Sequence, residues 1–167
     1  MKGKGAFFMN ETVQEEFEDS QAGKYLTFNL ENEIFGIDIK YVMEIIGIQR
    51  ITIIPEVPDY IRGIINLRGK IIPVMDVRLR FKKKLKEYND RTCIIVVDVN
   101  DLSVGLIVDR VSEVLSINPE DIVPPPEISQ GANKYVKGIG KSGGGVKLIL
   151  NCDKLLHEDI KEQLLHI

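Results

Sequence analysis

Residues 35–48 read Phe35-Gly-Ile-Asp-Ile-Lys-Tyr-Val-Met-Glu-Ile-Ile-Gly-Ile48, and 69 positions later the chain reads Val104-Gly-Leu-Ile-Val-Asp-Arg-Val-Ser-Glu-Val-Leu-Ser-Ile117. Gly, Val, Glu and the final Ile coincide, and five further positions are apolar in both segments. The match resumes with Gly63-Ile64 against Gly138-Ile139, now offset by 75 residues. Self-similarity at a fixed spacing indicates an internal duplication.

Each copy predicts the same order of elements. Apolar residues alternate in Leu26–Leu30 and again in Phe35–Ile39, on both sides of a short polar connection, which is typical of a β-hairpin. A third strand, a proline-broken loop, a second hairpin and a short helix follow. Asp76 is the predicted N-cap of the first of these helices.

The composition favours strands over helices. The chain of 167 residues holds 24 Ile and 15 Val but only 3 Ala, and β-branched side chains fit a pleated sheet better than a helix. Two five-stranded units of about 70 residues are too small to bury their sheets independently. We therefore expect a mainly β fold in which both copies share one hydrophobic core.

Charge divides the chain into a tail and a body. Residues 1–23 hold two lysines and five acidic residues, whereas residues 24–167 carry 20 basic and 20 acidic side chains. We expect a mobile acidic tail over 1–23, a domain over 24–157 and a C-terminal helix over 158–167. The domain divides into subdomains at about 24–85 and 91–157, with strand exchange between them left open.

Several function classes fit the sequence poorly. A neutral body without Trp argues against nucleic-acid binding, which relies on a basic surplus. The lysine cluster Lys82, Lys83, Lys84 and Lys86 is interpreted as a solvated loop. The sequence shows neither a signal peptide nor an apolar run of spanning length, so we expect a cytoplasmic protein with unpaired Cys93 and Cys152 and no direct membrane insertion.

The sequence also lacks catalytic equipment. Its two histidines, His157 and His166, both lie in the last eleven residues, and Gly140-Lys141-Ser142 lacks the upstream glycine of a phosphate-binding loop. Asp98-Val-Asn100 begins like a calcium loop but lacks the ordered glycine and glutamate. We therefore predict no catalytic residue, no metal site and no cofactor.

Three charged residues have two possible interpretations. They are solvated surface charges, or they take part in a function. Arg68 occupies the turn Asn66-Leu67-Arg68-Gly69 between two apolar strands, and Glu44 and Glu113 are equivalent in the two copies. Charged residues on edge strands commonly discourage edge pairing. Two neutral β-rich halves nevertheless suit partner binding better than catalysis.

An ordered series of motifs runs over about residues 24–156. It consists of Tyr25-Leu-Thr-Phe-x-Leu, Phe35-Gly-Ile-Asp-Ile, Val42-Met-Glu-Ile45, Gly63-Ile-Ile-Asn-Leu-Arg-Gly69, Ile72-Pro-Val-Met-Asp76 and Val104-Gly-Leu-Ile-Val-Asp109. This series resembles the CheW family of bacterial chemotaxis coupling proteins, and Val77 stands where the family commonly has leucine.

The resemblance implies two SH3-like five-stranded barrels around a shared core and a scaffold without catalytic activity. It implies an adaptor that joins the regulatory domain of the histidine kinase CheA to the cytoplasmic tip of chemoreceptors. It also suggests that such adaptors assemble into rings with kinase regulatory domains. The matching positions implied in receptor binding are Ile39, Val42, Glu44, Arg68, Val104, Gly105 and Val108. The resemblance places no kinase-binding residue. Such a protein is cytoplasmic and recruited to membrane-associated receptor arrays.

A helical receptor tip needs an apolar groove with a few charges that fix its register. Ile39, Val42 and Val108 are the expected groove wall, and Glu44 and Arg68 the expected rim. Two other hypotheses stay open at this point: a small barrel that binds RNA, and an enzyme whose site has no recognisable motif.

Overall fold

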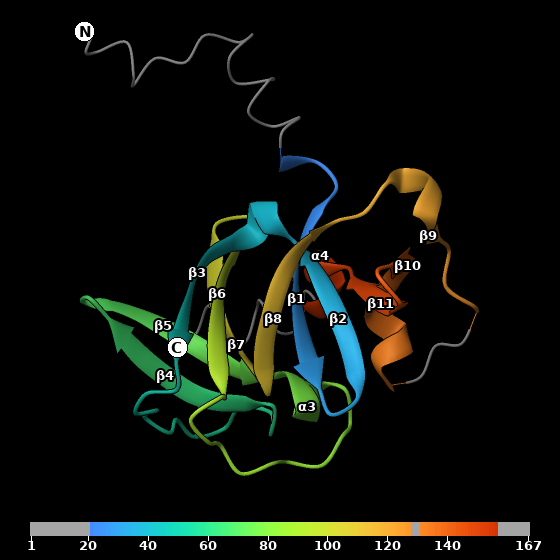
Figure 1. Ribbon diagram of the computed structural model, residues 1–167. Helices are drawn as coiled ribbons and strands as arrows, with labels where there is room; N and C mark the ends of the chain where they lie inside the picture. Colours follow the sequence, from blue (N-terminus) through green and yellow to red (C-terminus); the bar gives the residue numbers. More distant parts are fainter. Residues whose placement is uncertain (1–20, 128–130, 157–167) are drawn as a thin grey trace, which may run out of the picture.

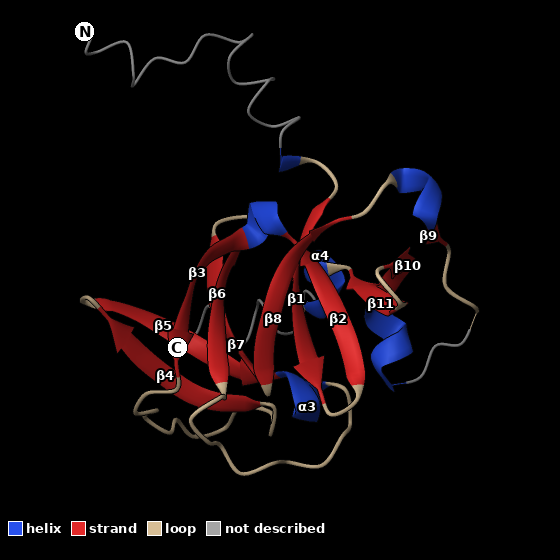
Figure 2. Cartoon of the chain, viewed as in Figure 1, coloured by secondary structure: helices blue, strands red, loops and turns tan. Residues whose placement is uncertain are grey.

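The structure, a computed structural model, describes residues 21–127 and 131–156 (Figure 1). The predicted acidic tail, apart from residues 21–23, and the predicted C-terminal helix over 158–167 lie outside the described residues. The described chain is mainly strand, joined by short helical segments (Figure 2), so the expectation of a mainly β fold is confirmed.

The first copy of the repeat runs from β1 to α3. Its elements are β1 (Lys24–Leu30), β2 (Glu33–Asp38), the 3-10 helix η1 (Ile39–Tyr41), β3 (Val42–Gly47), β4 (Ile61–Leu67), β5 (Lys70–Asp76) and α3 (Val77–Arg80). Asp76 caps α3 as predicted, because its Oδ1 accepts the backbone N–H of Leu79 at 3.3 Å.

The second copy repeats this order. Its elements are β6 (Cys93–Val99), β7 (Leu102–Val108), β8 (Arg110–Ser116), η2 (Pro119–Asp121), β9 (Ile122–Val123), η3 (Gly131–Tyr135), β10 (Val136–Ser142), β11 (Gly145–Leu150) and α4 (Cys152–Leu155). Asn151 caps α4 in the place of Asp76 and accepts the N–H of Lys154 at 2.9 Å. The duplication seen in the sequence is thus a duplication of structure.

The two copies exchange strands. One sheet has the order β3-β6-β7-β5-β4, and the other has the order β8-β1-β2-β11-β10-β9 (Figure 1). The hairpin of β6 and β7 therefore completes the sheet of the first copy, and the hairpin of β1 and β2 completes that of the second. The exchanged hairpins join their hosts through parallel pairing of β7 with β5 and of β2 with β11.

Each sheet curls back toward its own far edge. Thr52, downstream of β3, forms a bridge with Ile64 on β4, and β9, downstream of β8, pairs with β10. One sheet has five strands as expected, and the other has six because the two-residue β9 counts as a strand. We refer to the β3 sheet as the first barrel and to the β8 sheet as the second barrel.

Strand alternation divides the interior into three clusters. On β6, Ile95, Val97 and Val99 belong to a large cluster between the barrels, whereas Ile94 and Val96 belong to a smaller cluster inside the first barrel. A third cluster lies inside the second barrel around Tyr25, Ile117 and Ile149. The large cluster is the predicted shared core, since side chains from both copies contribute to it.

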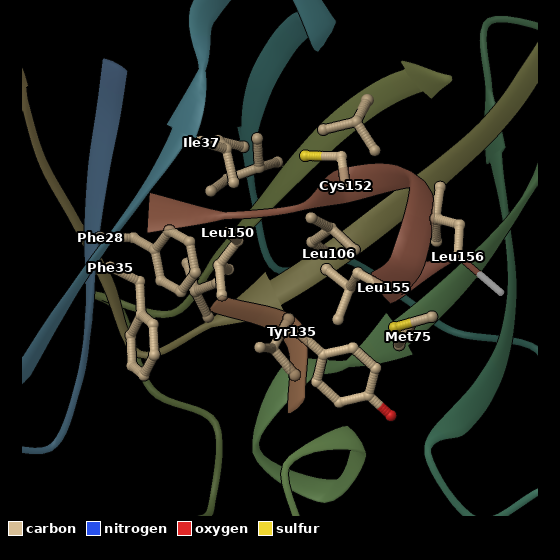
Figure 3. Packing of buried hydrophobic residues seen from close by; sticks show 14 of the residues in the cluster. Phe28, Phe35, Ile37, Met75, Leu106, Tyr135, Leu150, Cys152, Leu155 and Leu156 are labelled. Atoms are coloured by element: carbon tan, nitrogen blue, oxygen red, sulfur yellow. The ribbon is translucent and has the colours of Figure 1, made fainter. Parts of the chain in front are cut away.

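A chain of four aromatic rings, in two stacked pairs and one tilted pair, crosses this shared core. The ring centroids lie 5.6 Å apart for Phe28 and Phe35, 5.3 Å for Phe35 and Phe81, and 5.6 Å for Phe81 and Tyr135. Figure 3 shows Leu150 close to Phe28, and Leu155 close to Tyr135, within this core. The core thus packs α4 at the end of the second copy against strands of both barrels.

Candidate functional site

Glu44 and Arg68 meet on the surface of the first barrel. Glu44 lies on β3, Arg68 lies in the turn between β4 and β5, and both guanidinium Nη atoms donate to the two carboxylate oxygens. The Arg68 side chain is 70% exposed and that of Glu44 is 31% exposed. The hydrogen bond from Arg68 to the Glu44 carboxylate raises the pKa of Arg68. Both side chains are thus fixed by each other and still reachable by a partner.

The turn that carries Arg68 is conformationally demanding. Arg68 has φ 52° and Gly69 has φ 87°, the signs required at both central positions of a type I′ turn. Gly adopts this region freely, whereas a residue with a Cβ pays for it. Asn66 Oδ1 supports the turn by accepting the N–H of Gly69 at 2.8 Å. An arginine where Asn is usually preferred is therefore a local cost.

A surface pocket of about 300 Å³ adjoins this ion pair. Met43, Leu67, Ile72 and Val96 supply its apolar lining. Its polar lining comes from Glu44, Arg68, Lys70 and Ser103. We call it the Glu44 pocket; an apolar hollow rimmed by fixed charges can accept one side chain of a partner and set its orientation.

Ile39 and Val42 lie near this site along the chain. Ile39 belongs to η1 and Val42 begins β3 two residues before Glu44; both are half-buried and pack against the shared core. Their exposed portions remain available to a partner. On the same strand, Met43 is 62% exposed and Ile45 is 43% exposed, so β3 presents more apolar surface than the motif alone suggested.

Val104, Gly105 and Val108 lie elsewhere. Val104 and Val108 are 0% and 1% exposed in the shared core, and Gly105 is buried on the central strand β7. The Val108 side chain therefore does not form the groove wall that we expected from the sequence. These three residues could affect binding only indirectly, because their packing sets where β7 lies. The receptor-binding role of all seven residues stays a prediction.

A second charged cluster, which the reasoning from sequence missed, surrounds Arg78. Its Nε and Nη2 atoms donate to the two carboxylate oxygens of Asp109 at 2.7 and 2.6 Å, and Nη1 donates to Glu31 Oε1 at 3.0 Å. Nη1 also donates to the carbonyl oxygen of Lys84 at 3.2 Å. The only available signal was an arginine beside apolar residues in the short helix that follows Asp76.

Burial by itself would raise the pKa of Asp109. The hydrogen bonds from Arg78 and from the backbone N–H of Glu31, with the charges of Arg78 and Lys86, outweigh that effect and lower this pKa below its ordinary value. The same contacts raise the pKa of Arg78. Arg78 and Asp109 therefore stay ionised at neutral pH, and the cluster ties α3, the β1–β2 turn and the β7–β8 junction together.

The lysine cluster is largely the solvated loop expected from the sequence, since Lys82, Lys84 and Lys86 are exposed and Lys83 is half-buried. Lys83 Nζ lies 2.6 Å from Glu33 Oε1, and Lys86 Nζ lies 4.0 Å from Asp109 Oδ2. Farther along the loop, the Tyr88 hydroxyl donates to Asp76 Oδ2 at 2.6 Å. These contacts hold the segment between the two copies against both of them.

The described residues contain neither a metal-binding cluster nor a helix of membrane-spanning character. Within 21–127 and 131–156, no group of three or more His, Cys, Asp or Glu side chains could hold a metal ion. In the same part of the chain, no helix has the length and apolar character needed to cross a membrane. Cys93 is half-buried and Cys152 is buried, and both are free thiols.

Known proteins match most of the chain. The model of a family described as "CheW-like domain" matches residues 24–159. A chemotaxis protein CheW from Klebsiella aerogenes is 39% identical over 150 residues, which are 89% of this chain and 86% of that protein. One from Treponema pallidum is 32% identical over 147 residues, 85% of this chain and 86% of that protein.

A solved structure agrees with these matches. The crystal structure of the scaffolding protein TtCheW from Thermoanaerobacter tengcongensis superposes with a TM-score of 0.77 at 39% sequence identity. The superposition covers 85% of this chain and 92% of that one. Sequence and fold therefore lead to the same group of proteins.

Proposed function

The chain belongs to the CheW-like family, and from that premise we propose that it is a non-catalytic adaptor that couples chemoreceptors to the histidine kinase CheA. In this proposal the receptor's helical tip and the kinase's regulatory domain bind to it, and receptor state thereby controls kinase activity. The relatives are named as chemotaxis proteins and the structural neighbour as a scaffolding protein, which supports an adaptor role in chemotaxis.

The observation that carries the proposal is the Glu44 pocket. Its apolar lining can take an apolar side chain from a helix, and the ion pair of Glu44 with Arg68 supplies charges that define the register. A small interface of this kind suits a contact that must respond to signals, because modest interfaces exchange readily. Ile39 and Val42 would extend the receptor contact from η1 into β3.

The remaining surface leaves room for the kinase. The regulatory domain would bind away from the Glu44 pocket, so that both partners can be held at once, and repeated contacts of this kind would build rings. The adaptor would be cytoplasmic and recruited to receptor arrays at the membrane. No nucleic acid, metal or cofactor takes part in the proposal.

A three-component binding experiment tests the proposal. The full chain is mixed with a soluble helical-hairpin signalling fragment of a chemoreceptor, with the regulatory domain of CheA, and with both, and complexes are separated by size-exclusion chromatography. We expect each binary complex and a ternary complex. Failure of the wild-type chain to bind either partner would overturn the proposal.

A matched pair of variants locates the receptor contact. Arg68→Ala removes the guanidinium at the Glu44 pocket, whereas Arg50→Ala removes another exposed guanidinium of the first copy that does not line the pocket. We expect only Arg68→Ala to weaken the receptor complex, with the kinase complex unchanged. Equal receptor binding by the two variants would contradict the assigned position.

A further inference from the structure

Lys70 occupies a fixed position at the rim of the Glu44 pocket. It begins β5 directly after the turn of Arg68 and Gly69, and its Nζ donates to Ser103 Oγ at 2.9 Å. Ser103 Oγ in turn donates to Asp98 Oδ2 at 3.5 Å. Ser103 Oγ receives the ammonium group through an oxygen lone pair. Lys70 and Ser103 line the pocket, whereas Asp98 does not.

The charges of the lining do not cancel. Arg68 is matched by Glu44, but Lys70 is bonded to a neutral hydroxyl, and no carboxylate forms an ion pair with it among the residues that the structure describes. An ammonium group has three N–H donors, so two remain for a partner. The pocket wall therefore carries one positive charge in excess, at a defined place beside apolar surface.

We propose that Lys70 is a specificity-determining residue that selects a partner helix bearing a carboxylate next to an apolar side chain. The apolar side chain would enter between Met43 and Leu67, above the buried Ile72, and the carboxylate would meet Lys70 Nζ. On a helix, two such side chains share a face when they are three or four residues apart. This inference rests on the proposed function, since it names the chemistry by which the receptor helix is recognised.

A single carboxylate fits this pocket better than a polyanion. Glu44 lines the same wall and repels additional negative charge, and the Arg68 guanidinium is already engaged by it. Phosphate-rich partners need several free cations, and the lining offers one. The apolar residues Met43 and Val96 would also stay unused by a sugar-phosphate chain.

Charge reversal at Lys70 tests the inference. Lys70→Glu and Lys70→Met are compared with Lys141→Glu, which reverses an exposed lysine on β10 of the second barrel. Affinity for the receptor signalling fragment is measured by calorimetry at 50 and 500 mM salt. We expect Lys70→Glu to bind about tenfold more weakly at low salt, Lys70→Met to be intermediate, and the difference to shrink about threefold or more at high salt.

The fragment itself provides the second arm. Each exposed acidic residue of its tip is changed in turn to Lys, and one such change should weaken wild-type binding and restore binding to Lys70→Glu. If the wild-type chain binds but Lys70→Glu binds as well as Lys141→Glu, the inference is wrong and the proposed function stands. If the wild-type chain does not bind the receptor fragment, both the inference and the proposed function are overturned.

Discussion

The guanidinium of Arg78 and the carboxylate of Asp109 form a two-pronged ion pair, with side chains 5% and 12% exposed. Asp109 stands between β7 and β8, where the chain leaves the first barrel and enters the second. Arg78 stands in α3, at the end of the first copy. The pair therefore connects the copies at the point where strands are exchanged.

Removal of the Asp109 charge should destabilise the fold in a pH-dependent way. Asp109→Asn leaves a buried guanidinium with only the more exposed Glu31 as its charged partner, and we expect a loss of about 3 kcal/mol in unfolding free energy at pH 7. Since folding lowers the pKa of Asp109, its contribution is present above the ordinary value of 3.8 and is lost as pH falls through the folded value.

Urea unfolding at pH 7, 5, 4 and 3 checks this expectation. The difference between wild type and Asp109→Asn should be largest at neutral pH and shrink below pH 4. Asp90→Asn, which neutralises an exposed carboxylate, serves as the control. A constant difference across the series would show that the carboxylate's ionisation is not the cause.

The turn at Arg68 should trade stability against binding. Arg68→Asn places a residue that tolerates positive φ in the first central position of the type I′ turn, while it removes the guanidinium from the Glu44 pocket. We expect an unchanged or higher urea midpoint and weaker receptor-fragment binding. Arg68→Ala should bind equally weakly but unfold at a lower midpoint than Arg68→Asn. A lower urea midpoint for Arg68→Asn than for the wild type would contradict the proposed cost of arginine in this turn.

Gly105 should be required for packing. A Cβ at this position would lie 2.7 Å from Ile94 Cγ2 and 2.9 Å from Val74 Cγ1, so Gly105→Ala should cost about 1 to 3 kcal/mol by overpacking the first barrel. Gly47→Ala on β3 has open space and serves as the control. Ile94→Ala, which removes the clashing Cγ2 of a buried side chain, should therefore cost less in the Gly105→Ala background than in the wild type. Equal stability of the two alanine variants would contradict this account.

The two thiols should differ in reactivity. Burial raises the pKa of the Cys152 thiol to about 12, and this side chain is 3% exposed, whereas Cys93 is half-buried. Because the thiolate is the reacting species, iodoacetamide at pH 8 should alkylate Cys93 in the folded protein and Cys152 only after unfolding. Peptide masses of Cys93→Ser and Cys152→Ser assign each product, and similar rates for both thiols would refute the difference.

Local patterns predicted most elements, because period two and turn residues depend on neighbours in the chain. The alternation in Leu26–Leu30, the cap at Asp76 and the duplicated order of elements are all confirmed. Strand exchange was left open for a physical reason: an apolar strand has the same alternation whichever sheet it joins. Only the parallel pairing of β2 with β11 and of β7 with β5 decides it.

The sequence was a better guide to the charged residues of the candidate site than to its apolar residues. Glu44 and Arg68 meet although 24 positions separate them. Val104 and Val108 belong to an uninterrupted apolar run, which is typical of a strand buried on both faces, and that run could have indicated their burial. The engagement of Lys70 with Ser103 and of Arg78 with Asp109 depends on tertiary contacts that no local spacing encodes.

The exchange of hairpins also has a genetic consequence. Each copy of the repeat carries the two strands that the other copy needs, so a cut within residues 82–91 separates two fragments that each lack part of a sheet. Neither copy can be deleted, transplanted or duplicated again alone without exposing unpaired edges. The outer surfaces of the two copies can therefore change independently, whereas the strands that pair across the copies cannot.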